Sequence, residues 1–118
     1  MAGEIVHLEL PASDTARSRE FWGSLFGWQF EPMEGPFEYH MTRLAETQGA
    51  AVYPGEDTTA SRPYFSSDDI QATVARVREL GGQSDDAQPI PGMGWFATCT
   101  DTEGTPFGLW QTDPNASA

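Results

Sequence analysis

Two titratable side chains near the start of the chain could do chemistry together. The stretch HLELPASD begins at His7 and places Glu9 two residues further on. Side chains alternate along a β-strand, so both would share one face with Ile5, while the apolar Leu8 and Leu10 would share the other. A histidine and a carboxylate on one face could ligate a metal or exchange a proton with a ligand. They could equally be hydrogen-bonded or solvated residues of an ordinary strand.

Six further residues complete the set that we predict to contact a ligand. They are Tyr39, Arg62, Tyr64, Trp95, Gly108 and Trp110. Together with His7 and Glu9 they would make an aromatic cleft with a few polar groups, which is typical of a small-molecule site. The absent side chain of Gly108 would leave room for a flat ligand near Trp110. The alternation leaves the facing of Tyr39 and Trp95 open. The alternatives are that the aromatic rings fill a core and that Arg62 is a solvated linker residue.

The elements that would position these residues begin with a strand over residues 4–10 and a helix that Asp14 caps and Gly27 ends. Four apolar residues of this helix form one stripe, Phe21, Trp22, Leu25 and Phe26, and the three aromatic ones are predicted to be core. A second strand and helix lie in SRPYFSSDDIQATVARVRELGG, where Asp69 is the cap and Gly81-Gly82 is the stop. After each helix the pattern becomes strand-like.

A constant offset of 55 residues relates the two halves of the chain. Asp14 corresponds to Asp69, Leu25 to Leu80, and Gly27 to Gly82. We therefore expect one α+β domain over residues 1–118, built from two tandem βαβββ modules at 4–53 and 62–111 with a linker at 54–61. Packing helices outside and curling both sheets around a shared cavity would bury both faces of each sheet.

Composition excludes several classes of function. The formal net charge is -12, from eighteen acids against six arginines, which disfavours binding to nucleic acid and to anionic lipid but would attract a cation. Cys99 is the only cysteine, so we expect a core residue and neither a disulfide nor a cysteine-based zinc site. Without a signal-peptide pattern or a run of ~20 apolar residues, we expect a cytoplasmic protein that no membrane segment anchors.

Three segments resemble the vicinal oxygen chelate superfamily, which includes glyoxalase I, bleomycin-resistance proteins and extradiol dioxygenases. They are HLELPASD with Gly27 thirteen residues after its aspartate, then DDIQATVARVRELGG and DTEGTPFGLWQ. The resemblance covers residues 4–111 and implies two paired βαβββ modules whose sheets form a U-shaped pocket. Thr102 departs from the family pattern, which often has proline there. The superfamily includes lyases, dioxygenases and plain binders, so the resemblance does not decide between them.

The metal ligands that the resemblance implies are mostly missing. His7 matches the first ligand position, but Arg62 stands at the second, where a cation would be repelled. Gly108 stands where the family has its last metal ligand, a glutamate on the final strand. The corresponding position in the first module holds Tyr53, or Ala51 if the register slips by two. We therefore expect no metal and no other cofactor. A distorted site that uses Glu9 and Glu56 is the alternative.

Three functional hypotheses follow. The first is a metal-independent binding protein of the glyoxalase or bleomycin-resistance type that holds an aromatic or cationic small molecule in the cleft. The second is an enzyme, either a lyase or dioxygenase with atypical metal ligands or a metal-free catalyst with His7 or Glu9 as base. The third is a module that binds a protein or its own copy and whose tryptophans fill the cleft. An open sheet edge would also be compatible with a homodimer.

Overall fold

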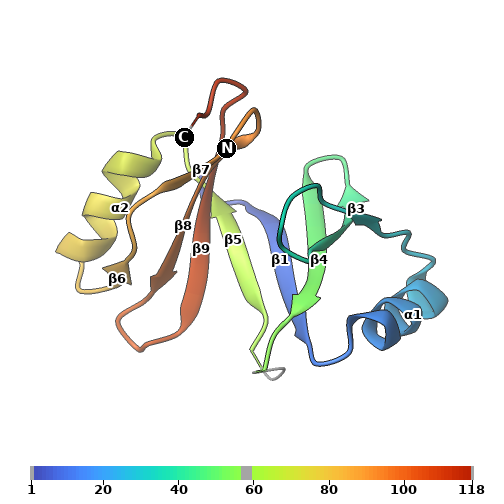
Figure 1. Cartoon of the computed structure of the whole chain (residues 1–118). Coiled ribbons are helices and arrows are strands. Elements are labelled where there is room, and N and C mark those ends of the chain that lie inside the picture. The colour runs from blue at the N-terminus through green and yellow to red at the C-terminus, as the bar shows by residue number, and fades with distance from the viewer. Residues whose placement is uncertain (1, 57–59, 118) are drawn as a thin grey trace. The chain divides into compact units, whose positions relative to one another are not determined.

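The computed structural model describes residues 2–56 and 60–117 and has a mixed α+β fold (Figure 1). The chain divides into two compact units, which we call the N-terminal unit (His7–Arg62) and the C-terminal unit (Met1–Val6 with Pro63–Ala118). No helix in the described residues is long and apolar enough to cross a membrane.

The boundaries of the units differ from those predicted at both ends of the first half. The N-terminal residues group with the second half because the amide of Gly3 donates to the Ser66 carbonyl at 2.9 Å and the Ser66 amide donates to the Glu4 carbonyl at 2.8 Å. Arg62 groups with the first half. Residues 57–59 of the predicted linker lie outside the described residues.

The N-terminal unit follows the predicted order of strand, helix and three strands. Its elements are β1 (Ile5–Ala12), α1 (Thr15–Phe26), β2 (Glu31–Pro32), β3 (His40–Ala45) and β4 (Gln48–Pro54). The strands pair in the order β2-β3-β4-β1, with β1 parallel to β4 and the other pairs antiparallel. Helix α1 contacts β4.

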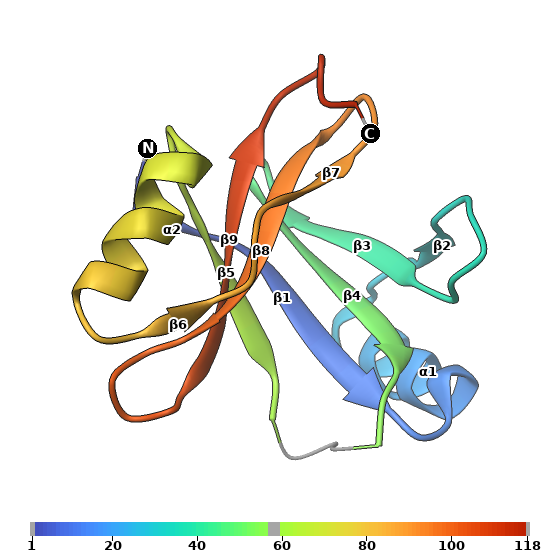
Figure 2. The same cartoon turned by 60° about the vertical axis from the view of Figure 1, so that its left-hand side comes forward.

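The C-terminal unit has one strand more than predicted. Its elements are β5 (Arg62–Ser66), α2 (Ile70–Glu79), β6 (Gln83–Ser84), β7 (Gln88–Ile90), β8 (Gly94–Thr100) and β9 (Pro106–Thr112). The strands pair in the order β5-β9-β8-β6, and β7 also pairs with β8 (Figure 2). The predicted βαβββ module has a single strand where β6 and β7 lie. Strand β7 is short and contains Pro89, which cannot donate to a ladder, so it carries little pattern.

Both predicted helix starts are confirmed. The Asp14 carboxylate accepts the Arg17 amide at 3.1 Å, and the Asp69 carboxylate accepts the Ala72 amide at 3.2 Å. The helix ends obey the offset of 55 less closely. Gly27 caps α1 in the left-handed conformation (φ 74°), whereas α2 ends at Leu80 and the left-handed glycine that follows it is Gly81 (φ 95°) rather than Gly82. That the two units are copies of one module stays a prediction.

The two helices bury very different amounts of apolar surface. In the C-terminal unit, Ile70 and Val74 of α2 form a core with Ala97, Cys99 and Leu109, so the core position predicted for the cysteine is confirmed. Helix α1 has no buried residue.

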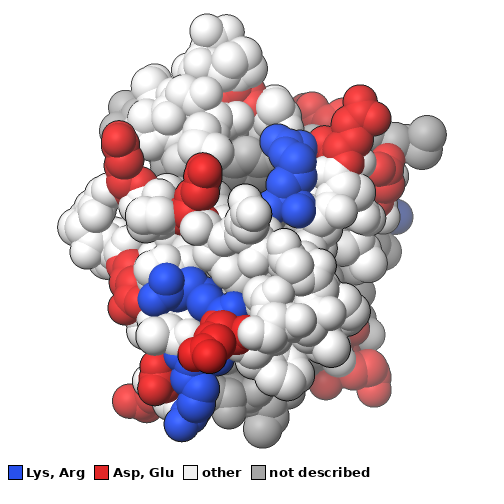
Figure 3. Space-filling model, turned by 90° about the vertical axis from the view of Figure 1, so that its right-hand side faces the viewer, with Lys and Arg blue, Asp and Glu red and all other residues white. Residues whose placement is uncertain are grey.

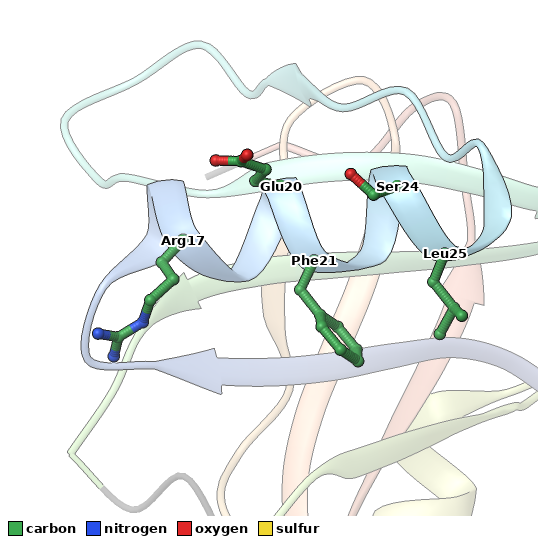
Figure 4. Close-up of a pocket in the computed structure, with 5 residues that line it drawn as sticks. All are labelled: Arg17, Glu20, Phe21, Ser24 and Leu25. Carbon is green, nitrogen blue, oxygen red and sulfur yellow. The ribbon is translucent and has the colours of Figure 1, made fainter.

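The core predicted on α1 is wrong for Phe21 and Phe26, two of its three aromatic residues. Phe21, Leu25 and Phe26 are 58%, 54% and 60% exposed, and only Trp22 is half-buried, stacked on the Trp28 ring at 5.1 Å. The four apolar positions span too wide an arc of the helix for all of them to face β4. In Figure 4 the side chains of Phe21 and Leu25 project from the same side of α1 as Arg17. Figure 3 shows positive and negative side chains scattered between uncharged areas on this face of the molecule.

Candidate functional site in the N-terminal unit

Three of the predicted site residues form a chain of hydrogen bonds. The Tyr39 hydroxyl donates to Glu9 Oε2 at 2.8 Å, and His7 Nε2 lies 2.7 Å from the same hydroxyl oxygen. His7 and Glu9 belong to β1, and Tyr39 directly precedes β3. All three side chains are partly buried. The structure thus answers the question that the alternation left open for Tyr39, which lies on the face of His7 and Glu9.

Sheet register explains why these side chains meet. His7 is opposite Gly49 and Glu9 is opposite Ala51 in the parallel pair of β1 and β4, while Met41 of β3 is opposite the same Ala51. Residues opposite one another point to the same face. Tyr39, two residues before Met41, therefore reaches across β4, where glycine and alanine offer no obstacle to a tyrosine or an imidazole.

The direction of the hydrogen bonds assigns the tautomer of His7. Tyr39 has one hydroxyl proton, which it donates to Glu9, so the imidazole must donate to the hydroxyl oxygen from Nε2. In the neutral ring the lone pair then resides on Nδ1. This atom lies 3.6 Å from the position that a Cβ on Gly49 would take. Burial lowers the pKa of His7 below its ordinary value, and the Glu9 carboxylate opposes this to a smaller extent.

Arg62 is the fourth predicted residue of the same cluster. Its Nη1 lies 3.7 Å from Glu9 Oε1, and the two side chains are 32% and 13% exposed. Its Nε is buried and has no hydrogen-bond partner among the described residues. Arg62 is therefore not a freely solvated linker residue, which was the alternative considered from the sequence. We call His7, Glu9, Tyr39 and Arg62 the β1 cluster.

The predicted site residues of the C-terminal unit do not leave the space expected from the sequence. Gly108 of β9 is opposite Tyr64 of β5 in a parallel pair, and the Tyr64 ring lies directly over it, so a Cβ at Gly108 would overlap the ring. Tyr64 is 6% exposed. The room expected above Gly108 for a flat ligand is thus filled by a neighbouring aromatic ring.

The two tryptophans of this unit lie on opposite faces of its sheet. Trp95 packs against the core of Ile70 and its neighbours, and its Nε1 donates to Asp113 at 3.0 Å. Trp110 follows the core residue Leu109 and so points to the other face, where its ring would lie 2.6 Å from a Cβ on Gly94. The structure therefore does not bring Trp95 together with Trp110, and the helix-side position of Trp95 indicates packing.

The residues present do not fit the divalent metal of the superfamily. No group of three or more His, Cys, Asp and Glu side chains in residues 2–56 and 60–117 could hold a metal ion. The Glu9 carboxylate belongs to the same cluster as His7, and the Arg62 guanidinium stands beside that carboxylate. A catalytic metal needs about three protein ligands, and a cation next to them would weaken its binding. Glu56, the other residue considered for a distorted site, is exposed.

A second polar group was missed because its members come from separate elements. Glu38 Oε2 accepts a hydrogen bond from the Thr15 hydroxyl at the start of α1 and lies 2.8 Å from His40 Nε2. These hydrogen bonds, the one from Thr15 first, hold the pKa of the exposed Glu38 carboxyl below its ordinary value. The alternation Glu38-Tyr39-His40 could have signalled that His40 faces away from the β1 cluster, but nothing in the sequence pointed to Thr15.

Comparison with known sequences identifies the class of protein. The sequence model of a family described as a glyoxalase-like domain matches residues 6–110. The chain therefore belongs to the glyoxalase-like domain family, and with it to the vicinal oxygen chelate superfamily that its three segments resemble.

Two sequence relatives differ in length. A glyoxylase-like domain-containing protein of Didymella fabae is 29% identical over 119 residues, which covers 91% of this chain and 92% of that protein. CFP32 of Mycobacterium bovis, a protein named as a glyoxylase, is 28% identical over 121 residues. That match covers 94% of this chain and 46% of CFP32, so the chain spans about half the length of the mycobacterial relative.

A solved structure with the same fold is the methylmalonyl-CoA epimerase of Streptomyces coelicolor in complex with 2-nitronate-propionyl-CoA. The TM-score is 0.76 and both chains are covered completely, with 16% sequence identity. At this identity the likeness shows the fold alone.

Proposed function

We propose that the protein binds a small organic molecule at the β1 cluster without a metal. One observation carries the proposal: the position where a metal ligand of the superfamily is expected holds His7, and its neighbours are a tyrosine hydroxyl and a guanidinium instead of further ligands. Partly buried polar groups that converge beside aromatic rings are typical of small-molecule sites. The ring of Tyr53, whose centroid is 6.1 Å from that of Tyr39, adds an aromatic surface.

The ligand predicted from the sequence was aromatic or cationic. Tyr39 and Tyr53 support an aromatic ligand, since flat rings pack well against them. The contributions expected of Tyr64 and Trp110 stay predictions, as does the homodimer, whereas the room expected above Gly108 is filled by the Tyr64 ring. Resemblance to an epimerase that binds a coenzyme A derivative adds only that this fold can hold an organic ligand.

A second candidate is metal-free acid–base catalysis, which the His7–Tyr39–Glu9 chain favours. A neutral imidazole could take a proton from a ligand, and the resulting positive charge would be stabilised by the Glu9 carboxylate through the Tyr39 hydroxyl. This arrangement needs no residue beyond those whose contacts are described above.

The test is a screen of small aromatic molecules against ¹⁵N-labelled protein that has been treated with a chelator. We expect at least one compound to bind, with chemical-shift changes centred on His7, Glu9 and Tyr39, and the same affinity after chelator is removed. Binding that requires an added divalent ion would contradict the proposal. So would shift changes confined to the C-terminal unit.

A further inference from the structure

Arg62 has unused hydrogen-bonding capacity. It is the first residue of β5, its side chain is two-thirds buried, and its buried Nε–H has no partner in the part of the chain that the structure describes. A guanidinium carries five N–H donors and remains charged at any ordinary pH. A buried donor without an acceptor is costly, so native proteins rarely keep one without a ligand or a water to satisfy it.

The neighbouring carboxylate does not satisfy the guanidinium. The 3.7 Å between Arg62 Nη1 and Glu9 Oε1 is an ion-pair distance and too long for a hydrogen bond. The other oxygen of Glu9 accepts the hydroxyl of Tyr39. Glu9 thus fixes the position of the guanidinium by charge and leaves its N–H donors to another acceptor.

The charges of the β1 cluster indicate the sign of the ligand group. Glu9 and Arg62 cancel, and the neutral form of His7 adds no charge, so the local charge is zero despite the -12 of the whole chain. Among the described residues of the cluster, the donor that lacks a partner is the Nε–H of Arg62, which belongs to a cation. A cationic ligand group would meet Arg62 as a like charge, whereas a planar oxyanion would accept two parallel N–H bonds from it.

We propose that Arg62 binds a carboxylate of the small-molecule ligand through its Nε–H and one terminal N–H. The inference rests on the proposed function and narrows the ligand class to small organic acids, aromatic ones in particular because of Tyr39 and Tyr53. It revises the expectation of a cationic ligand that the overall charge suggested.

The experiment compares three probes of one shape, which are benzoate, benzamide and benzylamine, by ¹H–¹⁵N NMR of the intact chain. The chain has six arginines and no lysine, so each Nε–H signal can be resolved and that of Arg62 assigned from its loss in Arg62→Gln. We expect benzoate to shift the Arg62 signal and to bind at least about tenfold more tightly than the other two probes, as a charge-assisted bidentate pair would.

Two variants of Arg62 distinguish the effect of its planar, bidentate geometry on binding from the effect of its charge. Arg62→Gln should weaken benzoate binding at least about tenfold, and Arg62→Lys should weaken it as well, because lysine keeps the charge but not the bidentate geometry. Arg43→Gln is the matched control: Arg43 is an exposed arginine of the same unit whose Nη1 donates to the Glu46 carbonyl at 2.7 Å. That variant should bind benzoate like the original chain, and thermal melts should confirm that all three variants are folded.

Two outcomes would overturn the inference in distinguishable ways. If benzamide or benzylamine binds as tightly as benzoate and shifts the signals of His7 and Tyr39, the carboxylate assignment is wrong while the proposed binding function stands. If none of the three probes shifts any signal of the N-terminal unit, both proposals are wrong. Equal binding of benzoate to Arg62→Gln and to the original chain would also refute the role of Arg62.

Discussion

The Tyr39 hydroxyl connects two side chains that the alternation of β1 only placed on a common face. It donates to Glu9 and accepts from His7, and both partners are partly buried. Hydrogen bonds of this kind contribute little net free energy when made, but a buried group that loses its partner retains the full cost of desolvation. The hydroxyl is therefore the residue-scale feature on which the candidate site depends.

Tyr39→Phe tests this dependence. We expect the free energy of unfolding to fall by about 1–3 kcal/mol, because the variant leaves His7 and Glu9 without their shared partner. Thr15→Val is a matched control that also removes a hydroxyl donor from a carboxylate, at the exposed Glu38, and it should cost less. Urea denaturation of both variants measures the difference. An equal loss would mean that burial of the β1 cluster has no energetic consequence.

The pH dependence of stability should report the buried histidine. The pKa of folded His7 lies below its ordinary value of 6.5, so between these two pKa values the unfolded chain binds the proton and the folded chain does not. Stability therefore rises with pH through this window and is lost as pH falls through it. NMR titration of His7 should give a pKa below 6.5, and His7→Gln should remove this part of the pH dependence. A pKa at or above 6.5 would contradict the effect of burial.

An NMR titration of His7 in the Glu9→Gln variant tests the second cause of the pKa shift of His7, which is the Glu9 carboxylate. The Glu9 carboxylate raises the pKa of His7 against the larger effect of burial. Its neutralisation should lower the pKa of His7 further. Glu38→Gln is the control, because Glu38 contacts the other histidine, His40, and that change should leave the His7 titration where it was. A rise in the His7 pKa in Glu9→Gln would contradict the assigned electrostatics.

At the scale of the elements, the two helices of similar sequence pattern have opposite roles. Ile70 and Val74 of α2 are 2% and 3% exposed, whereas Phe21 and Leu25 of α1 are more than half exposed. We expect Ile70→Ala to destabilise the protein by about 2–5 kcal/mol through the lost burial and the resulting cavity. Phe21→Ala should change stability by no more than about 0.5 kcal/mol. Thermal or urea unfolding measures both changes in stability. A large loss of stability in Phe21→Ala would contradict the exposure of α1.

The close packing of Tyr64 on Gly108 gives an element-scale prediction for β5 and β9. Gly108→Ala forces the buried tyrosine ring to move, since the new Cβ would overlap it, and overpacking of this kind costs about 1–3 kcal/mol. In a Tyr64→Ala background the same change should cost much less. A double-mutant cycle in urea measures the coupling. Additive losses would mean that the ring does not occupy the space above the glycine.

Sequence patterns located most elements because each depends on local physics. Asp14 and Asp69 cap helices through their own side chains, and alternation fixed β1 and β9 because one face of each strand is apolar. The short strands β2 and β7 were predicted imprecisely because a strand of two or three residues shows no periodicity. The exposure of α1 could not be read from its apolar stripe, since burial depends on what packs against the helix.

The candidate site was predictable to a similar extent. Alternation paired His7 with Glu9, but the position of Tyr39 beside them follows from the register of β3 and β4, which sequence does not encode locally. The contact between Arg62 and Glu9 joins residues more than fifty positions apart. Gly108 was misjudged because an absent side chain implies space only if no neighbour fills it, and Tyr64 does.

At the scale of the whole molecule, the central question is whether the fold of a superfamily with many metal enzymes is used here without a metal. The chain belongs to the glyoxalase-like domain family, and its described residues contain no group of side chains able to hold a metal ion. The β1 cluster offers hydrogen bonds and a guanidinium instead.

The most direct test is the metal content of protein purified without chelator, combined with thermal melts in the presence of Ni, Co, Zn, Mn or Fe(II). A ligand that binds the native state raises the melting temperature by an amount that grows with the logarithm of its concentration relative to Kd. We predict less than stoichiometric metal and no rise in melting temperature with any of these ions. One metal ion per chain, lost together with its stabilising effect in His7→Ala, would contradict the account and would make His7 a metal ligand.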